Sequence, residues 1–431
     1  MIPGARIQAA IELLDQIGAA TVPADRLVGN YFRSRRYAGS KDRRSVTETV
    51  YDVLRRQGEY AWRAGGTDSR RLVLAHLMLD QDRKADDVAA LFDAAKFCPV
   101  DLDADEQAAL AQLSRAAGRE APAWVAGNYP EWLHDPLTRR FGDELIVEMA
   151  AMQGRGSVDL RVNTLRSDIA KTADTLAADD IATTQGALAP TALRLQSRRS
   201  MINYPLYQSG AVEIQDEGSQ LVALLCAARP GQQVIDYCAG AGGKSLGLAA
   251  QMDNKGQIFA FDSAPQRLRP LRARLRRAGA RNIQVHALAD AAAITALANL
   301  AGKTDRVLLD VPCSGSGAWR RNPESKWRLT PEKLAEYGVT QGEILRRAAP
   351  LVKPGGRLIY ATCSILMEEN EDQIESFLKQ QPEFQVLPIG GVWHETLGTD
   401  CPSDAPYLHL TPARHGTDGF FVAILERREE T

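Results

Sequence analysis

The spacing of apolar residues over the first part of the chain is that of helices. Residues 1–125 place apolar side chains three or four positions apart, for example at Ile7, Ile11 and Leu14, and again at Val46 and Val50. Strand-like alternation is scarce in this part of the sequence. We therefore predict an all-helical domain over residues 1–125, which ends in a loose stretch rich in alanine and proline.

A short section of mixed pattern follows. Residues 157–162 alternate between polar and apolar positions, as a half-buried strand does, and residues 191–195 repeat the alternation. A helix is expected between these two strands, beginning at Ser167. The pattern predicts a linker helix and a small α+β module over residues 126–212.

From residue 213 onward, strands alternate with helices. Strand-like runs occur at residues 234–237, 258–262, 307–310 and 358–361, and helical spacing fills the intervals between several of them. This order is typical of a parallel α/β sheet. We assign residues 213–431 to one α/β domain.

Length and composition restrict the class of protein. A chain of 431 residues exceeds what one hydrophobic core usually serves, and its 45% hydrophobic and 25% charged residues are ordinary for a globular protein. No apolar run approaches the roughly 20 residues that span a bilayer. The N-terminus lacks the pattern of a secretory signal. We expect a cytoplasmic protein that does not associate with membranes.

The six cysteines indicate free thiols. No two of them form a Cys-x-x-Cys pair, so neither a zinc site nor a disulfide framework is expected. The net charge of −2 hides one strongly basic stretch, because Arg267 to Arg281 contains seven arginines and no acidic residue. Such a stretch suits a nucleic-acid surface. On charge alone, however, a solvated helix face is the better explanation.

A loop of small residues follows the first strand of the α/β domain. It reads Asp236-Tyr237-Cys238-Ala239-Gly240-Ala241-Gly242-Gly243-Lys244-Ser245. Small residues let the backbone approach a ligand, and the next helix offers free N–H groups. Asp262 ends the following strand, where a carboxylate can accept hydrogen bonds from both ribose hydroxyls of an adenosine-type cofactor.

Two other ligands must be compared with that cofactor. The loop nearly matches the phosphate-binding pattern Gly-x-x-x-x-Gly-Lys-Ser of ATPases, but Cys238 occupies the position of the leading glycine. A nicotinamide cofactor requires Gly-x-Gly-x-x-Gly, and the glycines here stand at 240, 242 and 243. Both alternatives lack a defining glycine.

Two cysteines follow strands of the same sheet. Cys313 lies in Asp310-Val311-Pro312-Cys313, and Cys363 lies in Ala361-Thr362-Cys363-Ser364. The carboxyl ends of strands in an open α/β sheet border the ligand crevice, so both thiols should lie beside the glycine loop. Carbon 5 of cytosine accepts a methyl group only after a thiolate adds to carbon 6, with an acid at nitrogen 3 and a proton acceptor nearby. Cys363, Cys313 and Asp310 could supply this set, and the residues alone do not decide which thiol attacks.

At these motifs the sequence resembles the RsmB and Sun/Fmu (Nop/Sun) family of RNA 5-methylcytosine methyltransferases. The shared signatures are residues 215–220, 238–244, 310–317, 320–323 with 326–327, and 362–364 with 369–370. The resemblance implies a Rossmann-like class I methyltransferase that uses S-adenosylmethionine, with Cys363 attacking the base and Cys313 assisting product release. In DNA cytosine-5 methyltransferases the Pro-Cys thiol attacks, which makes Cys313 as nucleophile the main alternative.

The resemblance also implies binding residues. The cofactor site would be lined by Cys238, Ala239, Gly240, Ala241, Gly242, Gly243, Lys244, Asp262, Arg267, Asp290 and Asp310. RNA phosphates would be contacted by Arg320, Arg321 and Lys326. The alternative for each of these three cations is plain surface charge.

The first two parts of the chain extend the resemblance. Residues 39–44 and 53–56 are similar to the NusB-like RNA-binding domain of the family, and residues 160–164 are similar to its small RRM-like module. We expect a monomer without a metal whose substrate is ribosomal (16S) RNA, with transfer RNA second. The alternatives are a ribosome-assembly factor that has lost catalysis and a magnesium-dependent ATPase. The target base must leave any stack to meet the thiol.

Overall fold

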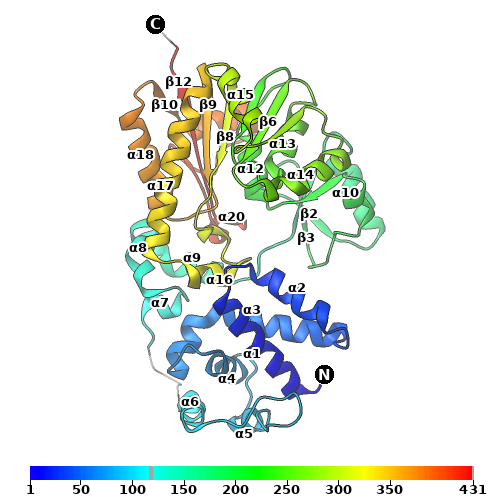
Figure 1. Ribbon diagram of the computed structural model, residues 1–431, viewed down its shortest axis with the longest axis vertical. Helices are drawn as coiled ribbons and strands as arrows, with labels where there is room; N and C mark the ends of the chain where they lie inside the picture. The colour runs from blue at the N-terminus through cyan, green and yellow to red at the C-terminus, as the bar shows by residue number, and fades with distance from the viewer. Residues whose placement is uncertain (116–119, 430–431) are drawn as a thin grey trace. The chain divides into compact units, whose positions relative to one another are not determined.

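The computed structural model of the protein describes residues 1–115 and 120–429. Contacts divide the chain into two units (Figure 1). The first unit combines Met1–Arg155 with Ala318–Leu329, and the second combines Gly156–Gly317 with Thr330–Thr431. The sequence assigned residues 126–155 to the module and 318–329 to the α/β domain. Their contacts group both segments with the N-terminal helices.

The first unit is helical over its described residues, as the apolar spacing predicts. Its helices are α1 (Pro3–Ala19), α2 (Ala24–Ser34), α3 (Ser40–Ala64), α4 (Ser69–Leu79), α5 (Ala85–Ala89), α6 (Ala104–Arg115), α7 (Ala123–Ala126), α8 (His134–Phe141), α9 (Leu145–Met152) and α16 (Pro323–Arg328). The core gathers Leu13 of α1, Val50 and Val53 of α3, and Leu74 and Leu77 of α4, none of which is exposed. The helices pack because each buries one apolar stripe.

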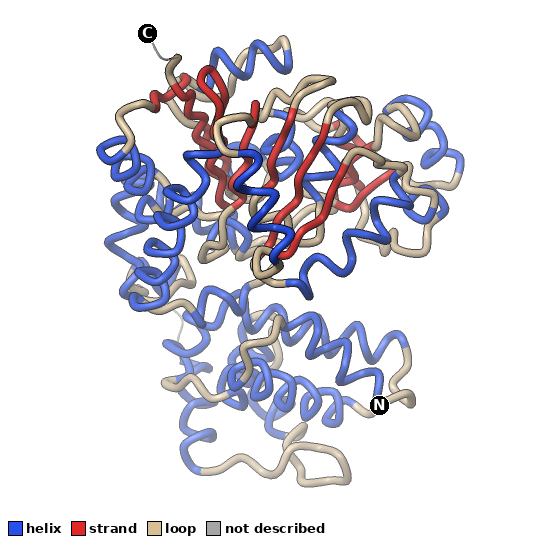
Figure 2. Tube along the Cα trace, turned by 45° about the horizontal axis from the view of Figure 1, so that its top comes forward, coloured by secondary structure: helices blue, strands red, loops and turns tan. Residues whose placement is uncertain are grey.

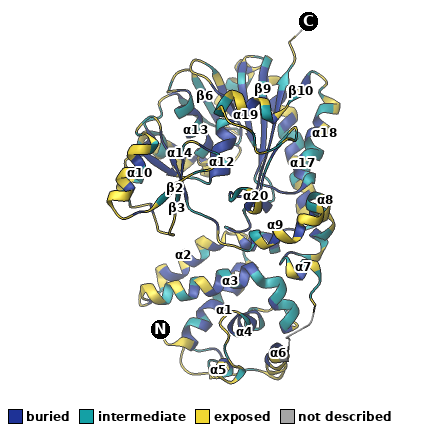
Figure 3. Ribbon diagram, turned by 180° about the vertical axis from the view of Figure 1, so that it is seen from behind, coloured by how far each residue is buried: buried dark blue, intermediate teal, exposed yellow. Residues whose placement is uncertain are grey.

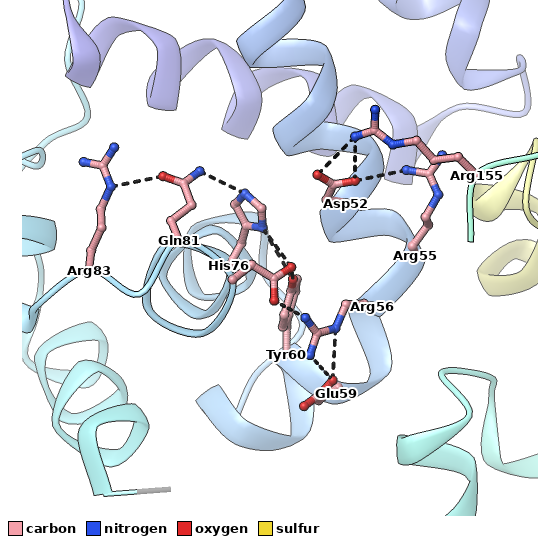
Figure 4. A network of polar contacts seen from close by, with 10 residues as sticks. Asp52, Arg55, Arg56, Glu59, Tyr60, His76, Gln81, Arg83 and Arg155 are labelled. Carbon is pink, nitrogen blue, oxygen red and sulfur yellow. Dashed lines mark hydrogen bonds and ion pairs between the residues drawn. The ribbon is translucent and has the colours of Figure 1, made fainter. Parts of the chain in front are cut away.

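A polar network links the second half of α3 to the end of α4 (Figure 4). Arg56 forms ion pairs with Glu59, at 2.6 Å, and with Asp80. The Asp80 carboxylate also accepts a hydrogen bond from Tyr60 and lies 3.6 Å from His76 Nδ1. Burial raises the pKa of Asp80, but hydrogen bonds from His76 and Tyr60 and the charge of Arg56 outweigh it and lower that pKa to about 2. The network holds the second half of α3 against the end of α4.

Helix α3 is kinked at Arg56, whose φ of −110° and ψ of 20° are not helical. Two side chains of α16 bind the backbone at this kink. Trp327 Nε1 donates to Leu54 O at 2.7 Å, and Lys326 Nζ donates to Arg55 O at 3.4 Å. Side chains that bond to backbone groups within a helix are a known cause of kinks. Segment 318–329 is therefore built into the helical unit.

The second unit begins with a four-stranded antiparallel module. Its elements are β1 (Asp159–Val162), α10 (Ile169–Ala178), β2 (Thr183–Gln185), β3 (Ala192–Leu195), α11 (Pro205–Gln208) and β4 (Val212–Ile214). The strand order β2-β3-β1-β4 and the chain order βαββαβ are those of a ferredoxin-like fold. The sequence predicted β1, α10 and β3. It missed β2 and β4, which have only three residues each.

The rest of the second unit is an eight-stranded mixed sheet that carries helices (Figure 2). Its strands are β5 (Gln233–Asp236), β6 (Gln257–Asp262), β7 (Ile283–Ala287), β8 (Thr304–Asp310), β9 (Val352–Thr362), β10 (Phe384–Leu387), β11 (Leu408–Leu410) and β12 (Phe420–Arg427). Its helices are α12 (Glu217–Leu224), α13 (Gly243–Gln251), α14 (Pro265–Ala278), α15 (Ala291–Leu300), α17 (Pro331–Ala348), α18 (Glu371–Gln380), α19 (Ile389–Leu397) and α20 (Pro412–His415).

Strand order places the functional loops. The path is β10-β12-β9-β8-β5-β6-β7, with β9 to β7 parallel and β12 antiparallel to β9. This is a Rossmann-like arrangement with an antiparallel edge, and its chain order reverses between β5 and β8. Val307, Leu308 and Leu309 of β8 have no exposed surface, because both faces of a parallel sheet are covered. The buried strands appear dark blue in Figure 3.

Among the described residues, none of the helices combines the length and the apolar character that crossing a membrane requires.

Candidate active site

The glycine loop connects β5 to α13 with two left-handed residues. Gly240 has φ of +53° and Gly242 has φ of +82°. A Cβ on Gly242 would overlap the Leu271 side chain of α14, so the turn packs too closely for any other residue. Gly242 stands at the N-cap of α13, whose first N–H groups face the turn. The loop is thus a backbone cradle at the carboxyl end of β5.

Asp262 fixes this cradle from the end of β6. One carboxylate oxygen accepts from Gly240 N at 2.9 Å, and the other accepts from Ala264 N at 2.8 Å. Arg267 Nη1 lies 3.7 Å from the first of these oxygens. Asp262 is 2% exposed. Each carboxylate oxygen can accept a second bond, so the carboxylate retains the capacity to hold two hydroxyl groups.

Lys244 and Asp310 form an ion pair beside the loop. Lys244 Nζ lies 2.7 Å from Asp310 Oδ2, and the lysine side chain is 10% exposed. Burial opposes the charge on Lys244, but Asp310 outweighs it and raises the pKa of the ammonium. A negative charge on Cys363 would raise it further, so the Lys244 ammonium can interact electrostatically with that sulfur.

Asp236 is a buried acid beneath the loop. It has no exposed surface and accepts a hydrogen bond from Ser245 Oγ at 2.6 Å. Its other oxygen, Oδ1, has no hydrogen-bond partner among the described residues. Burial raises the pKa of Asp236 to about 7. The sequence placed Asp236 at a strand end and gave it no role.

The two thiols lie against each other. Cys313 Sγ is 3.4 Å from Cys363 Sγ. The contact arises because β8 and β9 are parallel neighbours in which Asp310 pairs with Ala361, so the loops after both strands start side by side. The hydrogen bond with Cys363, followed by burial, holds the pKa of Cys313 well above its usual range. The raised pKa favours the protonated form of Cys313, and either sulfur can donate the hydrogen of this contact.

Glu369 is an acid that holds the Cys313 loop. It has no exposed surface and follows the Cys363 strand, within η5 (Met367–Glu369). Its carboxylate accepts from Ser314 N at 2.8 Å, from Ser314 Oγ at 2.5 Å and from Gln341 Nε2 at 3.1 Å. Gln341 also donates to Pro312 O at 3.0 Å. These bonds fix the backbone on both sides of Cys313.

A second set of bonds holds the Cys363 loop. Thr362 Oγ1 donates to Asn370 Oδ1 at 2.6 Å, and Asn370 Nδ2 donates to Ser364 O at 3.0 Å. Ser316 Oγ lies 2.9 Å from Ser364 Oγ and accepts from Ile365 N at 2.9 Å. The two cysteine loops are therefore bonded to each other as well as to their own strands.

The end of the Cys313 loop passes very close to another backbone segment. Gly317 N donates to Cys363 O at 2.9 Å, and Gly419 N donates to Gly317 O at 2.8 Å. A Cβ on Gly317 would overlap the backbone of Gly419, so no side chain fits there. The loop from Cys313 to Gly317 is held at both ends.

The structure gathers most of the sequence-predicted site residues at one edge of the sheet. The glycine loop, Asp262, Asp310, Cys313 and Cys363 all follow the carboxyl ends of β5, β6, β8 and β9. Arg267 is exposed on α14, and Asp290 is exposed at the N-cap of α15, after β7. Cys238 lies in the loop, and burial raises its pKa.

The RNA-contact prediction does not fit the burial of Arg320 and Lys326, and for Arg321 it stays a prediction. Arg320 is 7% exposed and Lys326 is 3% exposed, so neither side chain is available on the surface as a phosphate contact requires. Lys326 bonds to the α3 backbone, and its burial lowers its pKa to about 7. Arg320, Arg321 and Lys326 were assigned to RNA because they are basic. The sequence does not reveal that α16 packs on helices far away in sequence. Arg321 is partly exposed and makes contacts within the protein.

Sequence reasoning missed the roles of Gln341, Ser316 and Glu369. Glu369 and Asn370 belong to the motif set, but their spacing from Cys363 does not reveal which loop they hold. Within the described ranges, no three His, Cys, Asp or Glu side chains gather as a metal site requires. The reactive groups at this edge of the sheet are thus two thiols, a lysine and carboxylates.

Comparisons with known proteins identify what the chain is similar to. The family model described as 16S rRNA methyltransferase RsmB/F matches residues 223–426, and the ferredoxin-like domain model of the same group matches residues 129–201. The chain is 32% identical over 418 residues to the probable ribosomal RNA small subunit methyltransferase B of Synechocystis, covering 90% of this chain and 91% of that one.

Solved structures show the same architecture. PH0851 superposes with a TM-score of 0.77 at 27% identity, covering 99% of both chains. NSun6 of Pyrococcus horikoshii, solved with SFG, gives a TM-score of 0.61 at 18% identity over 70% of this chain and 99% of that one. The latter likeness shows the fold alone.

Proposed function

Because the chain belongs to the RsmB/F family of 16S rRNA methyltransferases, we propose that it methylates carbon 5 of a cytosine in 16S rRNA through a covalent Cys363–base adduct. The observation that carries the proposal is the thiol pair. Two sulfurs 3.4 Å apart lie at the same sheet edge as the glycine cradle. Carbon 5 of a pyrimidine accepts a methyl group only after a nucleophile such as a thiolate has added to carbon 6, and a thiol at this sheet edge can supply that nucleophile.

The residues present fit S-adenosylmethionine. When bound, this cofactor supplies an electrophilic methyl group. The glycine cradle offers close backbone approach, and Asp262 keeps acceptor capacity for ribose hydroxyls. We assign the cofactor site to the loop from Cys238 to Lys244 with Asp262 and Asp310, and to Arg267 and Asp290 at its rim.

Cys363 is the better nucleophile of the two thiols. The hydrogen bond with Cys363, followed by burial, holds the pKa of Cys313 well above its usual range, so Cys313 is the poorer source of a thiolate. A negative charge on Cys363 interacts favourably with the Lys244 ammonium. The DNA-type alternative, in which Cys313 attacks, would require the protonated partner to give up its proton first.

The proposed reaction uses each group once. The Cys363 sulfur bonds to carbon 6 of the cytosine, while a proton on nitrogen 3 balances the charge that develops in the ring. Lys244 holds Asp310 Oδ2, so the other oxygen of Asp310 can carry a proton to nitrogen 3 as the sulfur adds and take it back when the sulfur leaves. After methylation, carbon 5 gives its proton to water, and the sulfur–carbon bond breaks with its electron pair returning to Cys363. Cys313 assists this release by donating a hydrogen bond to the departing sulfur.

The other parts of the chain would hold the RNA. We assign a NusB-like role to the helices of residues 1–125, an RRM-like role to residues 126–212 and catalysis to residues 213–431. Strands β1 and β3 carry no aromatic side chain, so the module would contact the RNA backbone instead of stacking bases. We also propose that the protein acts as a cytoplasmic monomer.

Bisulfite sequencing of 16S rRNA from cells with and without the gene tests the activity. One cytosine should lose its protection when the gene is deleted, and a wild-type copy should restore it while Cys363→Ala should not. If no cytosine changes status, the proposed function is wrong.

A further inference from the structure

Helix α14 has three faces with different neighbours. Its apolar face, with Leu268 and Leu271, packs against the sheet beside β6 and β7. A second face binds the ferredoxin-like module, because Arg274 and Arg277 pair with the buried Glu213 of β4 at 3.0 and 2.5 Å. These two faces account for the position of the helix.

The third face carries Arg269, Arg272 and Arg276, which are exposed. Their spacing of three and four residues puts them on one side of the helix over about 10 Å. None of the three side chains has a hydrogen bond or ion pair with any described residue. Moreover, residues 263–289 contain no acid at all. The face is a row of cations without an internal counter-charge.

A cleft continues this row at the end of α14. It has a volume of about 400 Å³ and is lined by Arg276 and Arg281 and, from the module, by Arg166. Arg166 Nε lies 3.4 Å from Ala278 O, which leaves its terminal nitrogens for a ligand. Three guanidinium groups from two parts of the unit therefore border one cleft.

Helix capping does not explain these charges. Arginines near a helix C-terminus can stabilise its dipole. Here, however, Asn163 Nδ2 already donates to Ala278 O at 2.9 Å, and Asn254 Nδ2 donates to Gly279 O at 3.0 Å. The terminal carbonyls have these partners without Arg276 or Arg281. A solvated face is the remaining plain explanation, and it predicts no effect of these residues on binding.

Helix α14 itself borders the cofactor loop. Arg274 donates to Ala241 O at 2.7 Å from a face of the helix that differs from that of the row, because it lies only two residues from Arg276. An RNA that extends past the active site can therefore reach α14 and continue onto its outward face. Phosphate contacts by guanidinium groups position a nucleic acid without reading its sequence.

We propose that the outward face of α14 and the cleft at its end bind the phosphate backbone of the substrate RNA beside the target cytosine. This inference rests on the proposed function for the identity of the RNA. The outward arginines set affinity and register and take no part in bond making.

The test compares two triple variants with the same loss of charge. R269Q/R272Q/R276Q removes the row, and the control K303Q/K379Q/R346Q removes three exposed cations elsewhere in the unit. Affinity for an unmodified 16S rRNA transcript is measured from about 50 to 300 mM salt, a range that brackets the physiological ionic strength of about 0.15 M. Methyl transfer is then measured against transcript concentration.

The row variant should bind the transcript about 10-fold or more weakly. The slope of log affinity against log salt concentration should be about 2 units shallower, because each lost phosphate contact to a single strand reduces that slope by about 0.7. Its KM should rise while kcat at saturating RNA stays within about twofold. The control should behave as the wild type. Binding of S-adenosylhomocysteine by calorimetry checks folding, and R166Q/R281Q provides an independent second variant.

Equal affinity and slope in the row and control variants would overturn the inference. A wild-type protein that binds the transcript with the expected slope but methylates nothing would instead refute the proposed function. The two failures are thus distinguishable.

Discussion

Asp236→Asn should change how stability depends on pH. The folded protein raises the pKa of this buried carboxyl from 3.8 to about 7, chiefly through burial. Because the pKa of Asp236 is higher in the folded than in the unfolded protein, its protonated form stabilises the fold. This stabilisation is fully present below the unfolded pKa, near 4, and is lost as the pH rises through about 7. Asparagine mimics the protonated acid, keeps an acceptor for Ser245 and removes this loss.

The size of the effect follows from the shift. Three pKa units correspond to about 4 kcal/mol over the whole window, at about 1.4 kcal/mol per unit. Between pH 5.5 and 8.5 only the upper half of that window is crossed, so about 2 kcal/mol is expected. For a domain of this size that is about 4–8 °C in Tm.

Calorimetric melting of the full-length wild type and variant at pH 5.5 and 8.5 measures this difference. The variant should gain about 4–8 °C relative to the wild type at the higher pH. The exposed Asp400→Asn serves as the matched control. A difference between Asp236→Asn and wild type that is the same at both pH values would refute the reasoning.

Three other substitutions test separate contacts. Lys244→Met removes the cation that interacts with the Cys363 sulfur. In a methyl-transfer assay it should lower kcat by about 10-fold or more, which corresponds to about 1.4 kcal/mol. An unchanged kcat would count against the interaction between Lys244 and Cys363. Gly317→Ala forces a Cβ into Gly419 and should cost about 1–3 kcal/mol in a denaturant melt, whereas Gly390→Ala, with open space around it, should not. Lys326→Met should leave RNA affinity unchanged, because the lysine is buried, and a tenfold weaker complex in a filter-binding assay would reinstate it as an RNA contact.

The sequence predicted those features that depend on local periodicity or on strand ends. Helical spacing located α1, α3 and α4, and alternation located β1 and β3. The rule that ligands lie at the carboxyl ends of strands placed Cys313 and Cys363 near each other, since β8 and β9 are adjacent and parallel. Short elements such as β2 and β4 gave too few positions for a periodicity to register.

What the sequence did not reveal depends on contacts between distant segments. Glu369 holds Ser314 across 55 positions, and nothing in the residues around either one indicates the partner. Lys326 looked like a phosphate ligand because it is basic, but it is buried and donates to Arg55 O, 271 positions away in sequence. The same ambiguity of charge applies to α14. There, only the structure separates the arginines that pair with Glu213 from those without a side-chain partner among the described residues.

The most direct test of the central claim is covalent trapping of the enzyme on its RNA. Cys313→Ala and Cys363→Ala are each incubated with the 16S rRNA transcript and S-adenosylmethionine, then separated on a denaturing gel. The account predicts an RNA-linked protein band for Cys313→Ala, in which Cys363 adds to the base but release is impaired, and none for Cys363→Ala. A band that forms with Cys363→Ala and is absent with Cys313→Ala would contradict it.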